Sequence, residues 1–195
     1  MQKLNQQPDI CPYFSPEFKV IPQYIIMKEG ECMELNNRTT SFFIFILSGE
    51  ITISFEQYTN RSVLENEMFF LPKNNCFKWK AVTQTVLILT GYNATIFPCT
   101  SVRARILYKI KAGVKFDCRG VVMKDEVKVV VNQMKHYLDS GINCHHMYIL
   151  KHKELYLMFK HFYTYEEIIQ IFYLILGSNP LFNERVLDNY LKVKT

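Results

Sequence analysis

The feature that most constrains the fold of this chain is a change in hydrophobic period near its middle. Up to about Thr95, apolar residues form short runs or alternate with polar ones, as in SFFIFILSGEITISFEQ at 41–57. Beyond Lys124 they recur every three or four residues, as in KDEVKVVVNQMKHYLDSG at 124–141. Alternation predicts half-buried strands, and the longer period predicts amphipathic helices. The pattern therefore predicts an α+β protein with its strands first and its helices after them.

The first half predicts a small barrel of short antiparallel strands. The run Phe42–Leu47 is apolar at every position, which is typical of a strand that is buried on both faces. Pro72 presets φ and Asn74 tolerates left-handed geometry, so residues 72–75 predict a turn. Alternation or apolar runs predict further strands at 51–55, Met68–Leu71, 77–80 and Thr85–Thr90. Several short strands joined by turns are typical of a β-barrel or sandwich.

The second half predicts helices at 124–138, 145–163, Tyr165–Leu176 and 184–193. Thr164 precedes two glutamates, which favours a helix start at this position. The first helix carries one apolar stripe, formed by Val127, Val130, Val131, Met134 and Leu138. The next helix is expected to carry another, formed by Met147, Leu150, Leu157 and Met158. We expect a barrel with an amino-terminal arm at 1–100, a connector at 101–123 and a helical subdomain at 124–195.

Charge and cysteine content set bounds on partners and compartment. The net charge of +5 is small, and much of the basic excess lies in the expected connector, at Arg103, Arg105, Lys109, Lys111, Lys115 and Arg119. We interpret this cluster as a solvated connector, because neither stacking aromatics nor a recognition helix accompanies it. The six cysteines form no CxxC pair, and no apolar signal core or membrane-length run is present. These features predict a cytoplasmic protein without a membrane partner.

The positions of the histidines argue against a metal enzyme. All five lie in the helical half, at His136, His145, His146, His152 and His161, and none falls in a predicted strand. A metal site on a barrel needs histidine and carboxylate ligands on its strands. We therefore predict no catalytic residues, no metal and no cofactor, and we interpret the histidines as solvated residues on helix surfaces.

The aromatic residues of the strands allow two interpretations. The residues concerned are Phe43, Phe45, Phe55, Phe70, Phe77 and Trp79. They fill the barrel interior, or they line a closed apolar pocket for a small molecule. The sequence leaves both interpretations open.

Two stretches resemble known families. VLENEMFFLPKNNCFKWK at 63–80 resembles the second motif of a cupin barrel, although its histidine is absent. Where that motif commonly has Gly-Asp and Pro-Gly, this chain has Asn66-Glu67 and Lys73-Asn74. From about Ser41 to its last residue, the chain also resembles the amino-terminal region of AraC-type transcription regulators. The matching motifs are Leu150-Lys151, Glu154-Leu155, Leu157-Met158 and Tyr163, then 166–172, and then Val186-Leu187 through Lys194.

The resemblance implies an effector-sensing and dimerisation module with a cupin-like barrel. In such regulators a DNA-binding domain follows, so DNA would be contacted only through that domain, which is absent from the chain ending at Thr195. A small-molecule effector would act through Leu191–Thr195, and a homodimer would form on helix 124–138 through the stripe from Val127 to Leu138. Two alternatives remain: a metal-dependent cupin-type enzyme such as a sugar isomerase, and a ligand-free structural dimerisation module.

Overall fold

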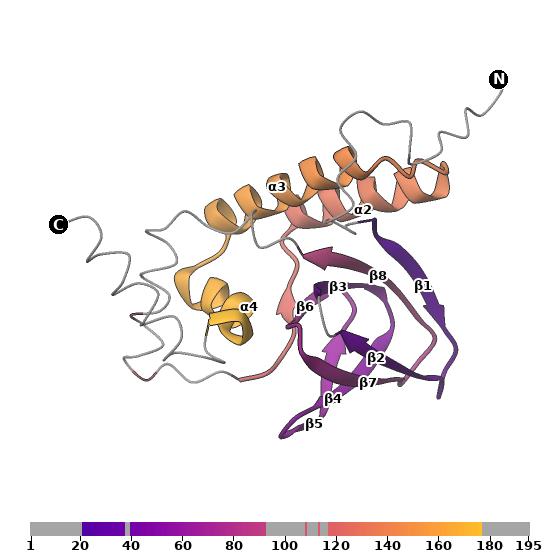
Figure 1. The fold of residues 1–195 in the computed structure, drawn as a ribbon, viewed down its shortest axis with the longest axis vertical. Coiled ribbons are helices and arrows are strands. Elements are labelled where there is room, and N and C mark those ends of the chain that lie inside the picture. Colours follow the sequence, from indigo (N-terminus) through magenta and orange to yellow (C-terminus); the bar gives the residue numbers. More distant parts are fainter. Residues whose placement is uncertain (1–20, 38–39, 93–107, 109–112, 114–116, 177–195) are drawn as a thin grey trace.

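The computed structural model describes residues 21–37, 40–92, 108, 113 and 117–176. Within these residues, two antiparallel sheets face each other, and three helices follow them along the chain (Figure 1). The first sheet has the order β1 (Gln23–Met27), β8 (Thr85–Tyr92), β3 (Ser41–Ser48), β6 (Glu67–Leu71) and β9 (Val121–Val122). The second has the order β2 (Cys32–Asn37), β7 (Asn75–Ala81), β4 (Glu50–Phe55) and β5 (Tyr58–Leu64).

The strands that carry the strongest apolar patterns occupy the predicted places. Strand β3 is buried on both faces over its central residues, whereas β4 and β7 alternate between buried and less buried side chains. The sequence did not predict β1, β2 or β5, which all lie at sheet edges. Most side chains of these three strands are at least partly exposed. Their sequences therefore carry too few apolar residues to show an alternating pattern.

Two tight turns depend on residues that accept a positive φ. Asn74 has a φ of 64° in the predicted turn between β6 and β7. Gly49 has a φ of 84° between β3 and β4, and a Cβ atom there would collide with the backbone carbonyl of Gln84. Glycine is therefore required at this position by both conformation and space.

The helices match their predicted limits closely. They are α2 (Asp125–Asp139), α3 (His145–Phe162) and α4 (Tyr165–Leu176). At the start of α4, the Thr164 hydroxyl accepts a hydrogen bond from the Glu167 amide at 3.2 Å, and the Glu167 carboxylate accepts one from the Thr164 amide at 2.7 Å. This reciprocal cap satisfies two amide groups that the helix itself leaves unpaired.

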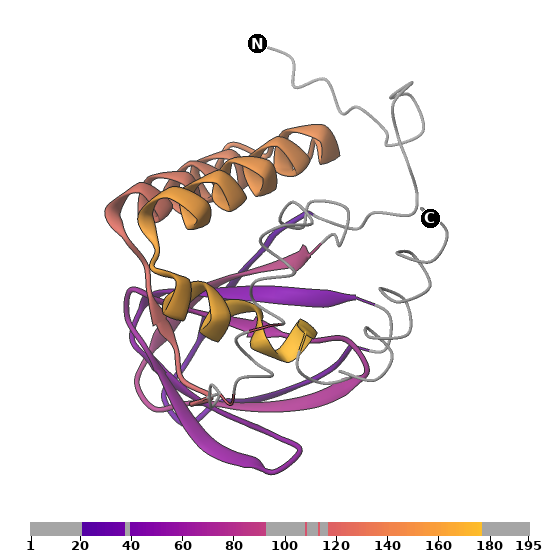
Figure 2. The ribbon, with the colours of Figure 1, turned by 90° about the vertical axis from the view of Figure 1, so that its left-hand side faces the viewer.

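The helices cover the outer face of the five-stranded sheet. Helices α2 and α3 lie side by side across the barrel, and α4 lies beyond the end of α3 (Figures 1 and 2). Helix α2 contacts β1, and α4 contacts β6 and β9. One continuous hydrophobic core joins the barrel to the helices. Within the described residues, no helix has the length and apolar character needed to cross a membrane.

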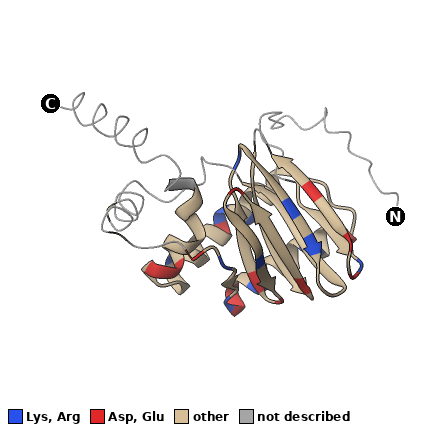
Figure 3. Cartoon of the chain, turned by 90° about the horizontal axis from the view of Figure 1, so that it is seen from below, with Lys and Arg blue, Asp and Glu red and all other residues tan. Residues whose placement is uncertain are grey.

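The expected connector contributes to the barrel. Val121 and Val122 form β9, which pairs with β6, so these two residues extend the sheet instead of merely linking two parts. Of the six basic residues expected there, the structure describes Arg119, which forms an exposed ion pair with Asp117 at 3.2 Å. Charges of both signs are interspersed on the strands (Figure 3). The boundary at residue 100, helix 184–193 and Leu191–Thr195 lie outside the described residues.

Candidate functional site

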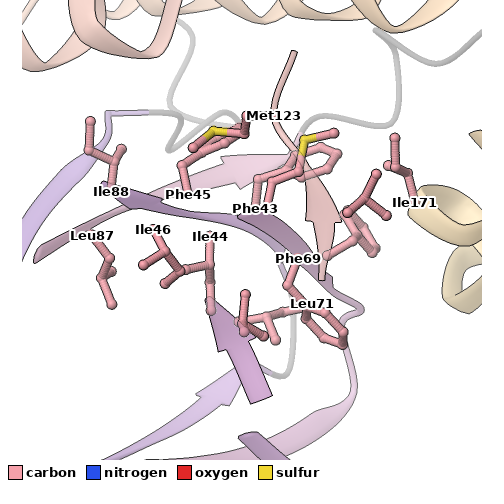
Figure 4. Close-up of a cluster of buried hydrophobic side chains, with 14 of the residues drawn as sticks. Phe43, Ile44, Phe45, Ile46, Phe69, Leu71, Leu87, Ile88, Met123 and Ile171 are labelled. Atoms are coloured by element: carbon pink, nitrogen blue, oxygen red, sulfur yellow. The ribbon is translucent and has the colours of Figure 1, made fainter. Parts of the chain in front are cut away.

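The six aromatic residues that were candidates for one pocket lie in two separate places. Strand β3 alternates, so Phe43 and Phe45 face the helices while Ile44 and Ile46 face the barrel interior (Figure 4). Phe70 on β6 pairs with Phe43 on β3, and both side chains lie on the helix-facing side of the sheet. The expectation of a single pocket lined by all six residues is therefore wrong, because the sheet separates them.

The barrel interior is filled by side chains. Phe77 and Trp79 are 0% and 1% exposed, and the rings of Phe55 and Phe77 lie 4.7 Å apart. Isoleucines from β3 and β4, namely Ile44, Ile46, Ile51 and Ile53, are all 0% exposed. Side chains in this position act as a packed core, which is usual for small barrels.

The helix-facing side of the sheet carries a second aromatic cluster. The ring of Phe43 lies 4.9 Å from Phe70, 5.6 Å from Tyr92, 5.8 Å from Phe159 and 6.1 Å from Phe172. These residues come from β3, β6, β8, α3 and α4. We call this region the sheet–helix junction. It joins the barrel to the helices through edge-to-face and tilted aromatic contacts, which are favourable arrangements.

A buried histidine lies beside this cluster. His152 on α3 is 7% exposed, and its Nε2 atom is 2.8 Å from the hydroxyl of Thr90 on β8. Burial, with a smaller effect of His145, lowers the pKa of His152 to about 4. His145 is also 7% exposed, and burial followed by the effect of His146 lowers its pKa. The interpretation of these two histidines as solvated surface residues is therefore wrong.

Among the described residues, two small cavities lie at the junction. One has a volume of about 20 Å³ and is lined by Phe43, Tyr92, His152, Leu155, Tyr156, Phe159 and Phe172. The other, of about 10 Å³, lies where β6, β9 and α4 meet, and Phe70 and Gln170 are among its lining residues. Pockets that enclose drug-sized molecules usually measure about 300–1,000 Å³. In this arrangement each cavity admits a group no larger than a water molecule.

A second set of contacts joins the strands to the helices at Tyr163. Its hydroxyl donates to the carbonyl of Val122 at 3.0 Å and accepts from the amide of Lys124 at 2.8 Å. Burial raises the pKa of Tyr163 to about 12, so the phenol stays protonated and keeps its donor. Lys124 also pairs with Glu167 at 3.3 Å. These contacts tie β9 and the start of α2 to the end of α3 and the start of α4.

The stripe predicted as a dimer contact on α2 is internal. Val127, Val130, Val131 and Met134 are each no more than 1% exposed within a single chain. Leu138 is partly buried against the same core. These side chains cannot meet a second copy without opening the fold, so their assignment to a dimer interface is wrong. The helix turns this stripe inward because α3 and the sheet provide the apolar surface that covers it.

The apolar face of α3 also differs from the prediction. Leu150 and Leu157 are 63% and 49% exposed, although they were expected in the buried stripe. The buried stripe is formed instead by His145, Tyr148, His152, Leu155 and Phe159. The spacing of His145, His152 and Phe159 at successive seven-residue steps was the available signal for this face. Thr90, Tyr92 and Tyr156 also lie at the junction, and no pattern in the sequence indicated them.

The described residues offer no cluster of metal ligands. Among residues 21–37, 40–92 and 117–176, no group of three or more His, Cys, Asp or Glu side chains is arranged to hold a metal ion. Strands β1 to β9 contain no histidine. Around the larger cavity, the described lining residues are apolar or neutral polar side chains.

The strand order defines the class of protein: it is an α+β protein with a cupin-like antiparallel barrel followed by helices. No protein-family model matches the sequence, and no curated protein matches it. A conserved protein of unknown function from Streptococcus pyogenes is similar in structure, with 19% identity, a TM-score of 0.34 and coverage of 37% of this chain and 62% of that chain.

Two further similar structures are named as cupin proteins. The Cnp3 cupin domain of Schizosaccharomyces pombe is 18% identical, with a TM-score of 0.35 and coverage of 38% of this chain and 53% of that chain. A cupin superfamily protein from Desulfitobacterium hafniense is 16% identical, with a TM-score of 0.34 and coverage of 37% and 66%. The matches therefore span about half to two thirds of each of these proteins.

Proposed function

We propose that this chain is the effector-sensing and dimerisation module of an AraC-like transcription regulator, and that it is not an enzyme. The observation that carries the proposal is the docking of α2, α3 and α4 on the outer face of the barrel through one continuous core. In a module of this kind, a change in the barrel would alter the position of the helices. The motifs from Leu150 to Tyr163 that resemble these regulators lie on the helix that makes this contact.

Two polar connections would carry the coupling between barrel and helices. One is the pair formed by Thr90 and His152, and the other is the set of contacts around Tyr163. An effector changes the relation between barrel and helices only if it binds two arrangements with different affinity. The helices would then pass the change to a DNA-binding domain, which would make the contacts with DNA in the cytoplasm.

In this proposal, two copies of the chain form a homodimer through the outer face of α3. Leu150 and Leu157 are seven residues apart, so they share a face of the helix, and both are about half or more exposed. A helix face that repeats an apolar residue every seven positions suits pairing with another helix.

Sedimentation equilibrium at micromolar concentration tests the dimer. The wild-type chain should have twice the mass of one copy, and L150D/L157D should be a folded monomer. Val129→Asp is the matched control, because Val129 is 56% exposed on the neighbouring helix α2. A monomeric wild type, or a dimeric double variant, would contradict this contact.

Transcription regulation is tested by fusion to a DNA-binding domain that needs a dimer to bind its operator. The fusion should control a reporter gene, and L150D/L157D should reduce that control to the level of the DNA-binding domain alone. Circular dichroism of the variant provides the folding control. A fusion that behaves like the isolated domain would refute the proposed function.

A ligand-free structural dimerisation module is a second candidate, and the packed barrel interior favours it. It predicts the same dimer but a reporter response that no small molecule alters. The metal-dependent cupin enzyme remains an alternative that elemental analysis can decide. If protein purified without a tag contains one equivalent of iron, manganese or zinc per chain, the enzyme is favoured over the sensor.

A further inference from the structure

The larger junction cavity is lined mainly by apolar and aromatic side chains, and His152 is among its lining residues. Nδ1 of His152 is buried and has no hydrogen-bond partner among the described residues. The other ring nitrogen is engaged by Thr90 at 2.8 Å. A buried polar atom without a partner costs free energy, so a group that supplies the missing hydrogen bond is favoured in this cavity.

The pairing with Thr90 limits the chemistry of that group. If the Thr90 hydroxyl donates to Nε2, then Nδ1 carries the ring proton and needs an acceptor. If Nε2–H donates to the Thr90 oxygen, then Nδ1 is bare and needs a donor. A hydroxyl group is both donor and acceptor, so it satisfies His152 in either tautomer.

The cavity lining also limits the charge of a ligand. The side chains around the cavity include no Lys, Arg, Asp or Glu among the described residues, and Phe43, Leu155, Phe159 and Phe172 are apolar. Burial lowers the pKa of His152 to about 4, so the imidazole is neutral near pH 7. A carboxylate or an ammonium group would lose its hydration here without gaining an opposite charge. The environment therefore favours a neutral ligand.

We propose that this cavity is a binding site for a neutral, apolar molecule bearing a hydroxyl group, with the hydroxyl placed against Nδ1 of His152. The inference rests on the proposed function and deepens it, because it gives the effector a location and a chemical class. The cavity of about 20 Å³ accepts the hydroxyl alone. The body of the ligand fits only when α3 moves relative to the sheet, so binding favours a changed relation of barrel and helices.

Phenol, toluene and benzoate are suitable probes, since they share a ring and differ in one group. Titrations of the full chain near pH 7, followed by NMR chemical shifts, give the dissociation constants. Phenol should bind about 3- to 10-fold more tightly than toluene, as expected for one net hydrogen bond. Benzoate should bind more weakly than both. Equal affinities for phenol and toluene, or no binding of either, would overturn the proposal.

His152→Phe tests the role of the imidazole. The variant should bind phenol no more tightly than toluene, because the phenol hydroxyl loses its partner. His161→Phe, an exposed change on the same helix, should keep the wild-type preference. A variant that retains the preference for phenol would overturn the assignment to His152.

A measurement on the wild type covers the case in which the variant does not fold. The imidazole ¹⁵N signals of His152 should shift on addition of phenol and stay unchanged on addition of benzoate. Unchanged His152 signals at saturating phenol would overturn the site. A chain that dimerises and regulates the fused reporter but does not bind phenol refutes this inference alone. A chain that binds phenol through His152 but does not regulate the reporter refutes the proposed function alone.

Discussion

The two faces of the five-stranded sheet differ in chemistry although the same strands build both. The face toward the barrel interior carries Ile44, Ile46 and Leu87, which are 0% exposed, and Phe69, whose ring lies 6.2 Å from that of Phe55 in the second sheet (Figure 4). The face toward the helices carries a phenylalanine cluster together with Thr90 and Tyr92. Apolar close packing favours one arrangement, whereas a face with cavities and polar contacts has fewer interactions that resist a shift. We therefore expect the junction to shift more readily than the barrel interior.

The largest expected effect comes from removing a ring from the barrel interior. Phe77→Ala should lower the free energy of unfolding by about 3–5 kcal/mol, because it leaves a cavity in a packed core. Phe43→Ala at the junction should cost less, since the junction already contains cavities and α3 can settle into the space. Chemical denaturation measures both, with Phe162→Ala at a 44% exposed position as the control. A larger loss for Phe43→Ala would reverse the comparison.

Acid should weaken the junction more than the barrel. The folded chain holds the pKa of His152 at about 4 against an ordinary value of 6.5, so the unfolded chain takes up the proton first as pH falls. This contribution to stability is fully present above about pH 6.5 and is lost progressively down to pH 4. The shift corresponds to about 3 kcal/mol.

Denaturation at a series of pH values measures this effect, and His152→Phe should remove that part of the slope. His161→Phe changes an exposed histidine on the same helix and should leave the slope intact. Equal slopes for the wild type and His152→Phe would show that the buried histidine does not control the response to acid.

A smaller loss is expected from Tyr163→Phe. The change removes the acceptor for the Lys124 amide and the donor for the Val122 carbonyl, at a cost of about 1–3 kcal/mol. Hydrogen exchange should show faster opening of α2 and α4 amides than of β3 and β8 amides. Tyr24→Phe, at a partly exposed ring on the sheet, is the control. Uniform acceleration across the barrel would contradict a junction that opens separately.

The smallest effect concerns the start of α4. Thr164→Ala should cost about 1 kcal/mol, because the Glu167 amide loses the hydroxyl that caps it. Thr164→Ser keeps a hydroxyl and should stay close to the wild type. Thermal denaturation of the two variants measures the difference, and equal melting temperatures would show that the cap contributes little to the junction.

Local patterns in the sequence determined most of the elements. The predicted limits of α4, Tyr165–Leu176, match the structure because a capping threonine and a following break are encoded within a few residues. The alternation in β4 and β7 and the turn at Asn74 have the same local origin. The edge strands β1, β2 and β5 escaped prediction because their exposed side chains leave no apolar period. The type and limits of an element were therefore predictable wherever its turn or cap residues and its side-chain period agreed.

Only the tertiary structure decided which apolar face meets which neighbour. Periodicity shows that Val130 and Met134 share a face of α2, but it does not show that α3 and the sheet cover that face. Strand β3 is apolar on both sides, so its sequence alone does not assign Phe43 to the helices or Ile44 to the barrel interior. Likewise, His152 meets Thr90 across 62 residues of chain. Such contacts depend on how whole elements pack, which a local period does not encode.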